Sequence, residues 1–134
     1  MNKPFGTHLI IDADCCEGKI TSKDHIQLFI NQLVEEMGMK KMGDTQFIYF
    51  EDNSYNRERD IVGYSVFQCI SLSSIVIHIN EISKTIYLDV FTCSSLNESN
   101  VVLLFSDFFK PTKIKTIDML RINQDIFSLH ISSI

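Results

Sequence analysis

Along much of the chain, apolar and polar residues alternate with a period of two, the spacing of a half-buried β-strand. These stretches are rich in β-branched and aromatic residues and end at polar or turn-forming residues. We expect strands over residues 5–12, 45–50, 64–70, 74–80, 84–91, 113–120 and 126–131. A tight turn near residues 81–83 should join the fourth and fifth strands as a hairpin.

Two other segments place apolar residues at intervals of three and four, which gives a helix one apolar face. Thr21 or Ser22 can cap the first helix, which ends at Gly38, and Pro111 stops the second. The apolar faces comprise Ile26, Phe29, Ile30, Leu33, Val34 and Met37 in the first, and Val101, Val102, Leu104, Phe105, Phe108 and Phe109 in the second.

These elements predict an α+β fold, a two-layer sandwich in which two helices pack on one face of an antiparallel β-sheet. The polar segment 51–60, EDNSYNRERD, is predicted to be a loop. With 134 residues, the chain suits a single domain, 1–134, that can bury a core. One layer of helices leaves the other sheet face needing cover.

Charge and composition narrow the function classes. The net charge of −5 makes a nucleic-acid surface improbable on electrostatic grounds and suits a neutral or cationic small molecule. No apolar run approaches the roughly 20 residues that cross a bilayer. The first residues lack a secretory cleavage pattern, so we expect a cytoplasmic protein with no membrane partner.

Four cysteines stand at positions 15, 16, 69 and 93, a spacing that fits neither a metal site nor a disulfide framework. We therefore expect free thiols, most of them filling the core, and no bound metal. P-loop, dinucleotide-binding and zinc-protease motifs are absent from the sequence. His78 and Cys93 could pair as an imidazole base and a thiol nucleophile, although two such residues often meet on neighbouring strands by chance.

Spacing around these two residues carries a more specific signal. Residues 72–82 read LSSIVIHINEI, and Asp89 to Cys93 read DVFTC. Both resemble, without a gap, the pattern E-S-H-x-(S/T)-I-H-T-W-P-E followed by D-V-F-T-C in the S-adenosylmethionine decarboxylase family, in its short-chain prokaryotic class. The opening GTHLIID from Gly6 and the turn Gly63-Tyr64-Ser65 are similar to two further family motifs, so the resemblance runs from Gly6 to about Phe109.

The resemblance implies an enzyme that cuts its own backbone between Leu72 and Ser73 to give a β chain, 1–72, and an α chain, 73–134. Ser73 would become a pyruvoyl group, which forms a Schiff base with the substrate amine and accepts electrons as the carboxylate leaves. By the same resemblance His78 and Ser65 assist processing, and Cys93 is the proton donor after decarboxylation. Ser73 and His78 lie on opposite faces of an ideal strand, so we expect a bend or bulge after Ser73.

Several positions depart from the family pattern. Leu72 replaces glutamate before the reactive serine, Ser74 replaces histidine after it, and Val66 replaces a glycine. Residues 79–82, Ile-Asn-Glu-Ile, replace T-W-P-E, whose glutamate contacts the ribose hydroxyls in the family. Glu81, Phe50 and Phe5 are candidate substrate-binding residues.

Three functions follow from the resemblance and these departures. The first is a decarboxylase of S-adenosylmethionine in polyamine (spermidine) synthesis. The second is a pyruvoyl-dependent decarboxylase of ornithine or arginine, favoured by the altered T-W-P-E. The third is a non-cleaving, inactive homologue that acts as a partner subunit. For the enzymes, the resemblance implies an amino-acid-type substrate and a homodimer of processed protomers.

Overall fold

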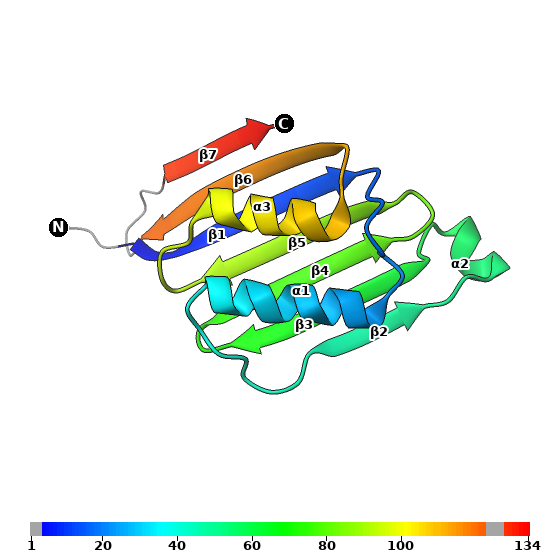
Figure 1. The fold of residues 1–134 in the computed structure, drawn as a ribbon, viewed down its shortest axis with the longest axis horizontal. Helices are drawn as coiled ribbons and strands as arrows, with labels where there is room; N and C mark the ends of the chain where they lie inside the picture. Colours follow the sequence, from blue (N-terminus) through cyan, green and yellow to red (C-terminus); the bar gives the residue numbers. More distant parts are fainter. Residues whose placement is uncertain (1–3, 123–127) are drawn as a thin grey trace.

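Seven strands form one antiparallel sheet within the described part of the chain, which the computed structural model gives as residues 4–122 and 128–134. The strand order is β2-β3-β4-β5-β1-β6-β7 (Figure 1). Their bounds are β1 Pro4–Asp14, β2 Gln46–Phe50, β3 Gly63–Ile70, β4 Ser73–Asn80, β5 Thr85–Thr92, β6 Lys113–Ile122 and β7 Ser128–Ser133. The described strands match the predicted ones, with ends that differ by a residue or two. Residues 126 and 127 of the last predicted strand lie outside the described residues.

Two helices, α1 (Lys23–Glu36) and α3 (Glu98–Phe109), lie side by side on one face of this sheet (Figure 1). The predicted α+β two-layer sandwich is therefore confirmed. Ser22 caps α1 by accepting a hydrogen bond from the His25 backbone N–H, and Gly38 follows the helix with φ +67°. Lys110 ends α3 in a left-handed conformation just before Pro111.

The core fills the space between the helices and the sheet. In α1 and α3 the buried side chains are spaced by three and four residues, and in the strands they alternate. Phe29 of α1 lies with its ring 5.9 Å from that of Phe105 and 4.9 Å from that of Phe109, both in α3. These edge-on ring contacts join the two helices over the centre of the sheet.

One helical turn, α2 (Ser54–Glu58), interrupts the segment that was predicted to be a loop. Asn53 caps it by accepting a hydrogen bond from the Asn56 backbone N–H at 2.8 Å. The turn buries no side chain, so the period of apolar residues gave no signal for it.

The cysteines differ from the expectation that most of them fill the core. Cys16 is buried, and burial raises the pKa of its thiol to about 12. Cys15 and Cys69 are exposed, and Cys93 is partly exposed, so that expectation is wrong. All four thiols are free.

The sheet face away from the helices is open in this chain. It presents His8 of β1, His78 of β4 and Tyr87 and Asp89 of β5, with apolar side chains such as Val76 between them. Among the described helices, none is long and apolar enough to cross a membrane.

Candidate active site

The strands β3 and β4 are joined by a two-residue turn, Ser71-Leu72, immediately before Ser73. Leu72 has φ +52°, which is the left-handed region, and its side chain is 73% exposed. For a residue with a Cβ, this conformation is about 1–2 kcal/mol less stable than the right-handed one. The peptide bond predicted to be cut thus follows a strained, solvent-exposed residue.

Ser73 turns its side chain toward the helix-covered face and is only 6% exposed. Its Oγ accepts a hydrogen bond from the Cys93 backbone N–H at 3.1 Å and lies 3.7 Å from Cys93 Sγ. The thiol also lies 3.7 Å from the Ser71 carbonyl oxygen. The structure therefore brings together the predicted cleavage site and the predicted proton donor, from the start of β4 and the residue after β5.

Ser65 and His78 form a second pair. They sit directly opposite each other on β3 and β4, and Ser65 Oγ is hydrogen-bonded to His78 Nδ1 at 2.8 Å. Both side chains project from the open face, where the ring of Phe67 stands edge-on to His78 at 6.1 Å. A hydroxyl held by an imidazole nitrogen can move a proton to or from a reacting group.

The two pairs do not meet within one chain. His78 lies five positions after Ser73, about 16 Å along an extended strand, and on the other sheet face. The register of β4 with both β3 and β5 runs without a shift, so the expected bend or bulge after Ser73 is not present in this continuous chain. Unbroken pairing on both sides leaves the strand no freedom to kink there.

A pocket of about 300 Å³ opens beside the Ser65–His78 pair. It lies between the end of β2, the loop before β3 and the hairpin between β4 and β5. Its lining residues are Phe50, Asp60, Ile61, Val62, Gly63, Tyr64, Ser65, His78, Ile79, Asn80 and Tyr87. Phe50, one of the predicted substrate-binding residues, is thus part of its wall. Phe5 lies at the start of β1, where the side chain is outside the described part of the structure.

Residues 80–82, in place of the W-P-E of the family pattern, serve the β4–β5 turn. Asn80 Oδ1 accepts hydrogen bonds from the backbone N–H groups of Ile82 and Ser83, at 3.0 and 3.1 Å. Its Nδ2 donates to the Asp60 backbone oxygen at 3.2 Å and to Asp60 Oδ1 at 2.9 Å. Asn80 therefore fixes the hairpin and ties it to the loop before β3.

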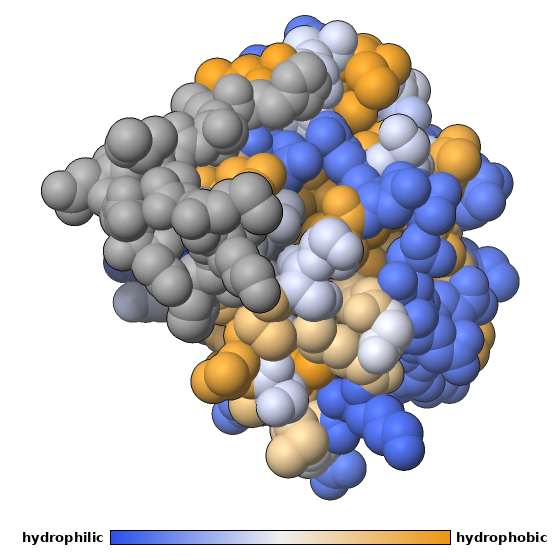
Figure 2. Space-filling model, turned by 90° about the vertical axis from the view of Figure 1, so that its left-hand side faces the viewer, coloured by the Kyte–Doolittle hydropathy of each residue, from blue (hydrophilic) through white to orange (hydrophobic). Residues whose placement is uncertain are grey.

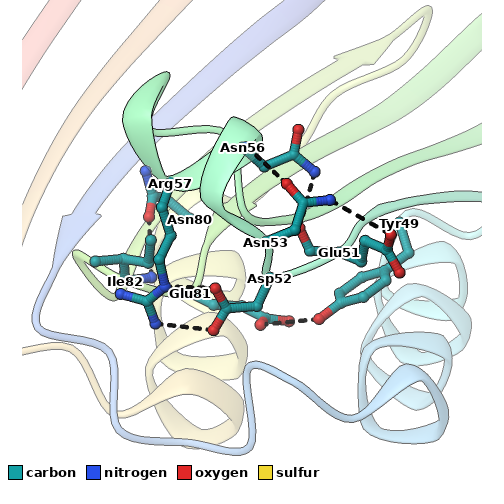
Figure 3. Close-up of polar contacts among 9 residues, drawn as sticks. All are labelled: Tyr49, Glu51, Asp52, Asn53, Asn56, Arg57, Asn80, Glu81 and Ile82. Atoms are coloured by element: carbon teal, nitrogen blue, oxygen red, sulfur yellow. Dashed lines mark hydrogen bonds and ion pairs between the residues drawn. The ribbon is translucent and has the colours of Figure 1, made fainter.

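Glu81 is not among the residues that line this pocket. Its Oε2 accepts a hydrogen bond from the Tyr49 hydroxyl at 3.2 Å, close to the Asp52–Arg57 ion pair (Figure 3). Tyr49 shares a strand face with Phe47, which packs against the core, so Glu81 lies at the helix-covered side of the sheet end. Partial burial and the Glu81 carboxylate raise the pKa values of both Tyr49 and Tyr64.

A second hollow of about 410 Å³ lies beside Cys93, at the end of the molecule that carries the Ser71-Leu72 turn. Figure 2 views this end, where apolar and polar surface are intermingled. The polar residues Thr7, Ser94, Ser95 and Asp118 are among those that line it. In the described residues, no three acidic, histidine or cysteine side chains are grouped closely enough to hold a metal ion.

Sequence reasoning missed two features of the open face. Asp60 and Tyr87 line the pocket, but neither belongs to a motif, and Asp60 simply ends a polar run. His8 Nε2 lies 3.0 Å from Asp89 Oδ1, which links the G-T-H motif of β1 to the D-V-F-T-C motif of β5. The presence of both motifs in the sequence indicated that they matter together. Their contact could not be predicted, because it depends on the register between β1 and β5.

Comparison with known protein families agrees with the motifs. A family model for S-adenosylmethionine decarboxylase matches residues 7–122, which include both pairs and the turn between them. A search of curated proteins found no match. Members of the matched family are decarboxylases, so the match supports carboxy-lyase activity. Since the match spans most of the described residues, the chain belongs to the S-adenosylmethionine decarboxylase family.

Proposed function

We propose that this chain is a self-processing, pyruvoyl-dependent decarboxylase that acts on S-adenosylmethionine as a cytoplasmic homodimer. The observation that carries the proposal is the position of Ser73. Its hydroxyl oxygen is held 3.1 Å from the Cys93 N–H and 3.7 Å from the Cys93 thiol, directly after the strained residue Leu72. The site thus combines the Ser73 hydroxyl, the strained backbone at Leu72 and the thiol of Cys93.

Processing begins with the Ser73 hydroxyl. Its oxygen attacks the Leu72 carbonyl carbon, the C–N bond breaks, and an ester replaces the amide while the Ser73 nitrogen becomes a free amine. The Cys93 N–H, which binds this oxygen, limits its motion. Leaving the left-handed conformation at Leu72 removes strain that the folded turn stores.

The second step requires a base that removes the Ser73 α-hydrogen. The bond between the Ser73 β-carbon and the ester oxygen then breaks, and residue 72 leaves as a carboxylate. Water next hydrolyses the nitrogen from the new chain end, which releases ammonia and leaves a ketone. His78 is the candidate base, yet it lies about 16 Å away along β4 and on the opposite face. We therefore infer that His78 and Ser65 act on the Ser73 of a second copy, which also gives the open sheet face a cover.

The residues around position 73 fit a pyruvoyl group. Ser73 Oγ would leave with the carboxylate of residue 72, and the ketone oxygen would come from water. The Cys93 N–H, released from Oγ, would then be a free hydrogen-bond donor beside the new group. Such a group supplies an electron sink for loss of carbon dioxide. Cys93 then has one task, to deliver the thiol proton to the substrate carbon that has lost its carboxylate.

Intact mass measurement of the purified, folded chain tests the proposal. We expect two fragments, 1–72 and 73–134, whose masses together equal that of the chain plus water minus ammonia. Ser73→Ala should give one uncut chain, while Ser74→Ala should still be cut. An uncut wild-type chain in a well-folded sample would favour the inactive-homologue function and rule out the enzyme.

A second candidate function is decarboxylation of a basic amino acid, such as ornithine or arginine. The observation that favours it is the use of Asn80 and Glu81 to hold the hairpin end, which leaves neither in the position of a nucleoside-binding group. Carbon dioxide release from S-adenosylmethionine, ornithine and arginine, measured separately with the processed protein, distinguishes the two candidates.

A further inference from the structure

We propose that Asp60 is the residue that selects a positively charged substrate, by pairing with the cationic group of the bound molecule in the Ser65–His78 pocket. The inference rests on the proposed function, because it concerns the substrate of the same site. The shared chemistry is a cation several bonds from the reacting carbon: the sulfonium of S-adenosylmethionine or the terminal ammonium of a basic amino acid.

The charge of the pocket favours a cation. Among the residues that line it, all of them in the described part of the chain, Asp60 is the sole carboxylate, and there is no lysine or arginine. The side chains of Phe50 and Tyr87 form parts of its wall and remain 38% and 46% exposed. Aromatic faces attract cations, and an adjacent carboxylate adds a direct charge interaction.

Asp60 is held in place rather than free to rotate away. Its backbone is left-handed, with φ +56°, a conformation that aspartate and asparagine adopt more readily than other residues with a side chain. Asn80 Nδ2 binds both its backbone oxygen and its Oδ1. A carboxylate positioned in advance loses less entropy when it pairs with a ligand.

Glu81 does not supply this charge. Its carboxylate binds the Tyr49 hydroxyl on the helix-covered side of the sheet end, whereas His78 faces the open side. The hairpin that redirects Glu81 is the one in which Asn80 holds Asp60. Where the family pattern has T-W-P-E, this chain thus has a hairpin that holds the Asp60 carboxylate of the loop before β3.

The test compares Asp60→Asn with the charge control Asp107→Asn, which removes an exposed carboxylate on α3. Asparagine tolerates the left-handed backbone and can still accept the Asn80 hydrogen bond. Calorimetric titrations use the Ser73→Ala chain, in which nothing is turned over, and KM values use processed enzyme. The ligands are S-adenosylmethionine, its neutral thioether analogue and ornithine.

We expect Asp60→Asn to weaken binding of the cationic ligand about fivefold and to leave the thioether analogue nearly unchanged, with Asp107→Asn like the parent. If only the affinity for S-adenosylmethionine falls, the group that pairs with Asp60 is the sulfonium. If only the affinity for ornithine falls, it is the terminal ammonium. Equal affinities in Asp60→Asn and its parent, or no binding of either cation to the folded parent, overturn the inference. Cleavage is scored separately by mass, so a cut chain that fails this test keeps the proposed function.

Discussion

The two ends of β4 carry the two halves of the candidate site, and they are built differently. At its start, Ser73 is buried toward the helices and fixed by Cys93 next to a strained turn. Toward its end, His78 and Ser65 stand on the open face above a pocket. The first end is suited to bond breaking in its own chain, and the second presents a proton-transfer pair outward.

Under the proposed function, this difference means that a single chain does not bring its own His78 to its own Ser73. An unbroken strand keeps Ser73 and His78 roughly 16 Å apart, and no side-chain rotation spans that distance. The proposed homodimer addresses this distance, because a second chain would bring another copy of the outward pair. The experiments below separate the contributions of the two ends, in order of decreasing effect.

Mixed dimers give the largest expected effect. Ser73→Ala chains retain His78, and His78→Ala chains retain Ser73, so neither is cut efficiently alone. When differently tagged chains are refolded together, we expect the His78→Ala chain to be cut by its neighbour, since general-base catalysis contributes about 10²–10⁴-fold. The fraction of cut chain, read by intact mass, checks this. The mixture could instead contain no more cut chain than the separate variants, while the unfolding temperatures show that both variants are folded. That result would show that His78 acts within its own chain or not at all.

Replacing the thiol separates cleavage from turnover. We expect Cys93→Ala to be cut, because the backbone N–H that binds Ser73 Oγ is unchanged, while decarboxylation slows about 10²–10⁴-fold. Carbon dioxide release from processed protein provides the rate, and Cys69→Ala is the matched control at an exposed thiol. Full activity in Cys93→Ala would remove the proton-donor role.

The strain at the turn should be measurable as stability. In the uncut Ser73→Ala background, Leu72→Gly should raise the free energy of unfolding by about 1 kcal/mol, because glycine adopts positive φ without a Cβ penalty. Urea unfolding compares it with Leu72→Ala, which retains the Cβ and should show no such gain. If the glycine and alanine variants are equally stable, the turn stores no strain at Leu72.

The smallest effect concerns Asp12 of β1, which lies level with His78 across β5. Burial and then the nearby Asp89 carboxylate raise the pKa of Asp12 above its usual value near 3.8. A raised carboxyl pKa stabilises the fold below the unfolded-state pKa, and this stabilisation is lost as pH rises through the folded-state pKa. Asp12→Asn should thus stabilise the chain at neutral pH by about 0.5 kcal/mol or less, given solvent screening, and not at pH 3. Urea unfolding at both pH values tests the sign.

Much of the fold could be predicted because its local signals agree with the tertiary structure. Alternation identified the described strands, and Ser22, Gly38 and Pro111 marked helix boundaries through capping and backbone restrictions. The helix α2 was missed, since a single turn with no buried side chain has no apolar period. The predicted bend after Ser73 was wrong because β3 and β5 both pair with β4 and hold it straight.

The sequence by itself determined the kind of fold and the family motifs, and it identified Ser65, Ser73, His78 and Cys93 as candidates, since each depends on residue type and spacing. Only the tertiary structure decided which of these residues meet and which carboxylate faces the pocket. The physical reason is that strand register and the left-handed turn at Asp60 set directions in space, and these directions arise from long-range pairing.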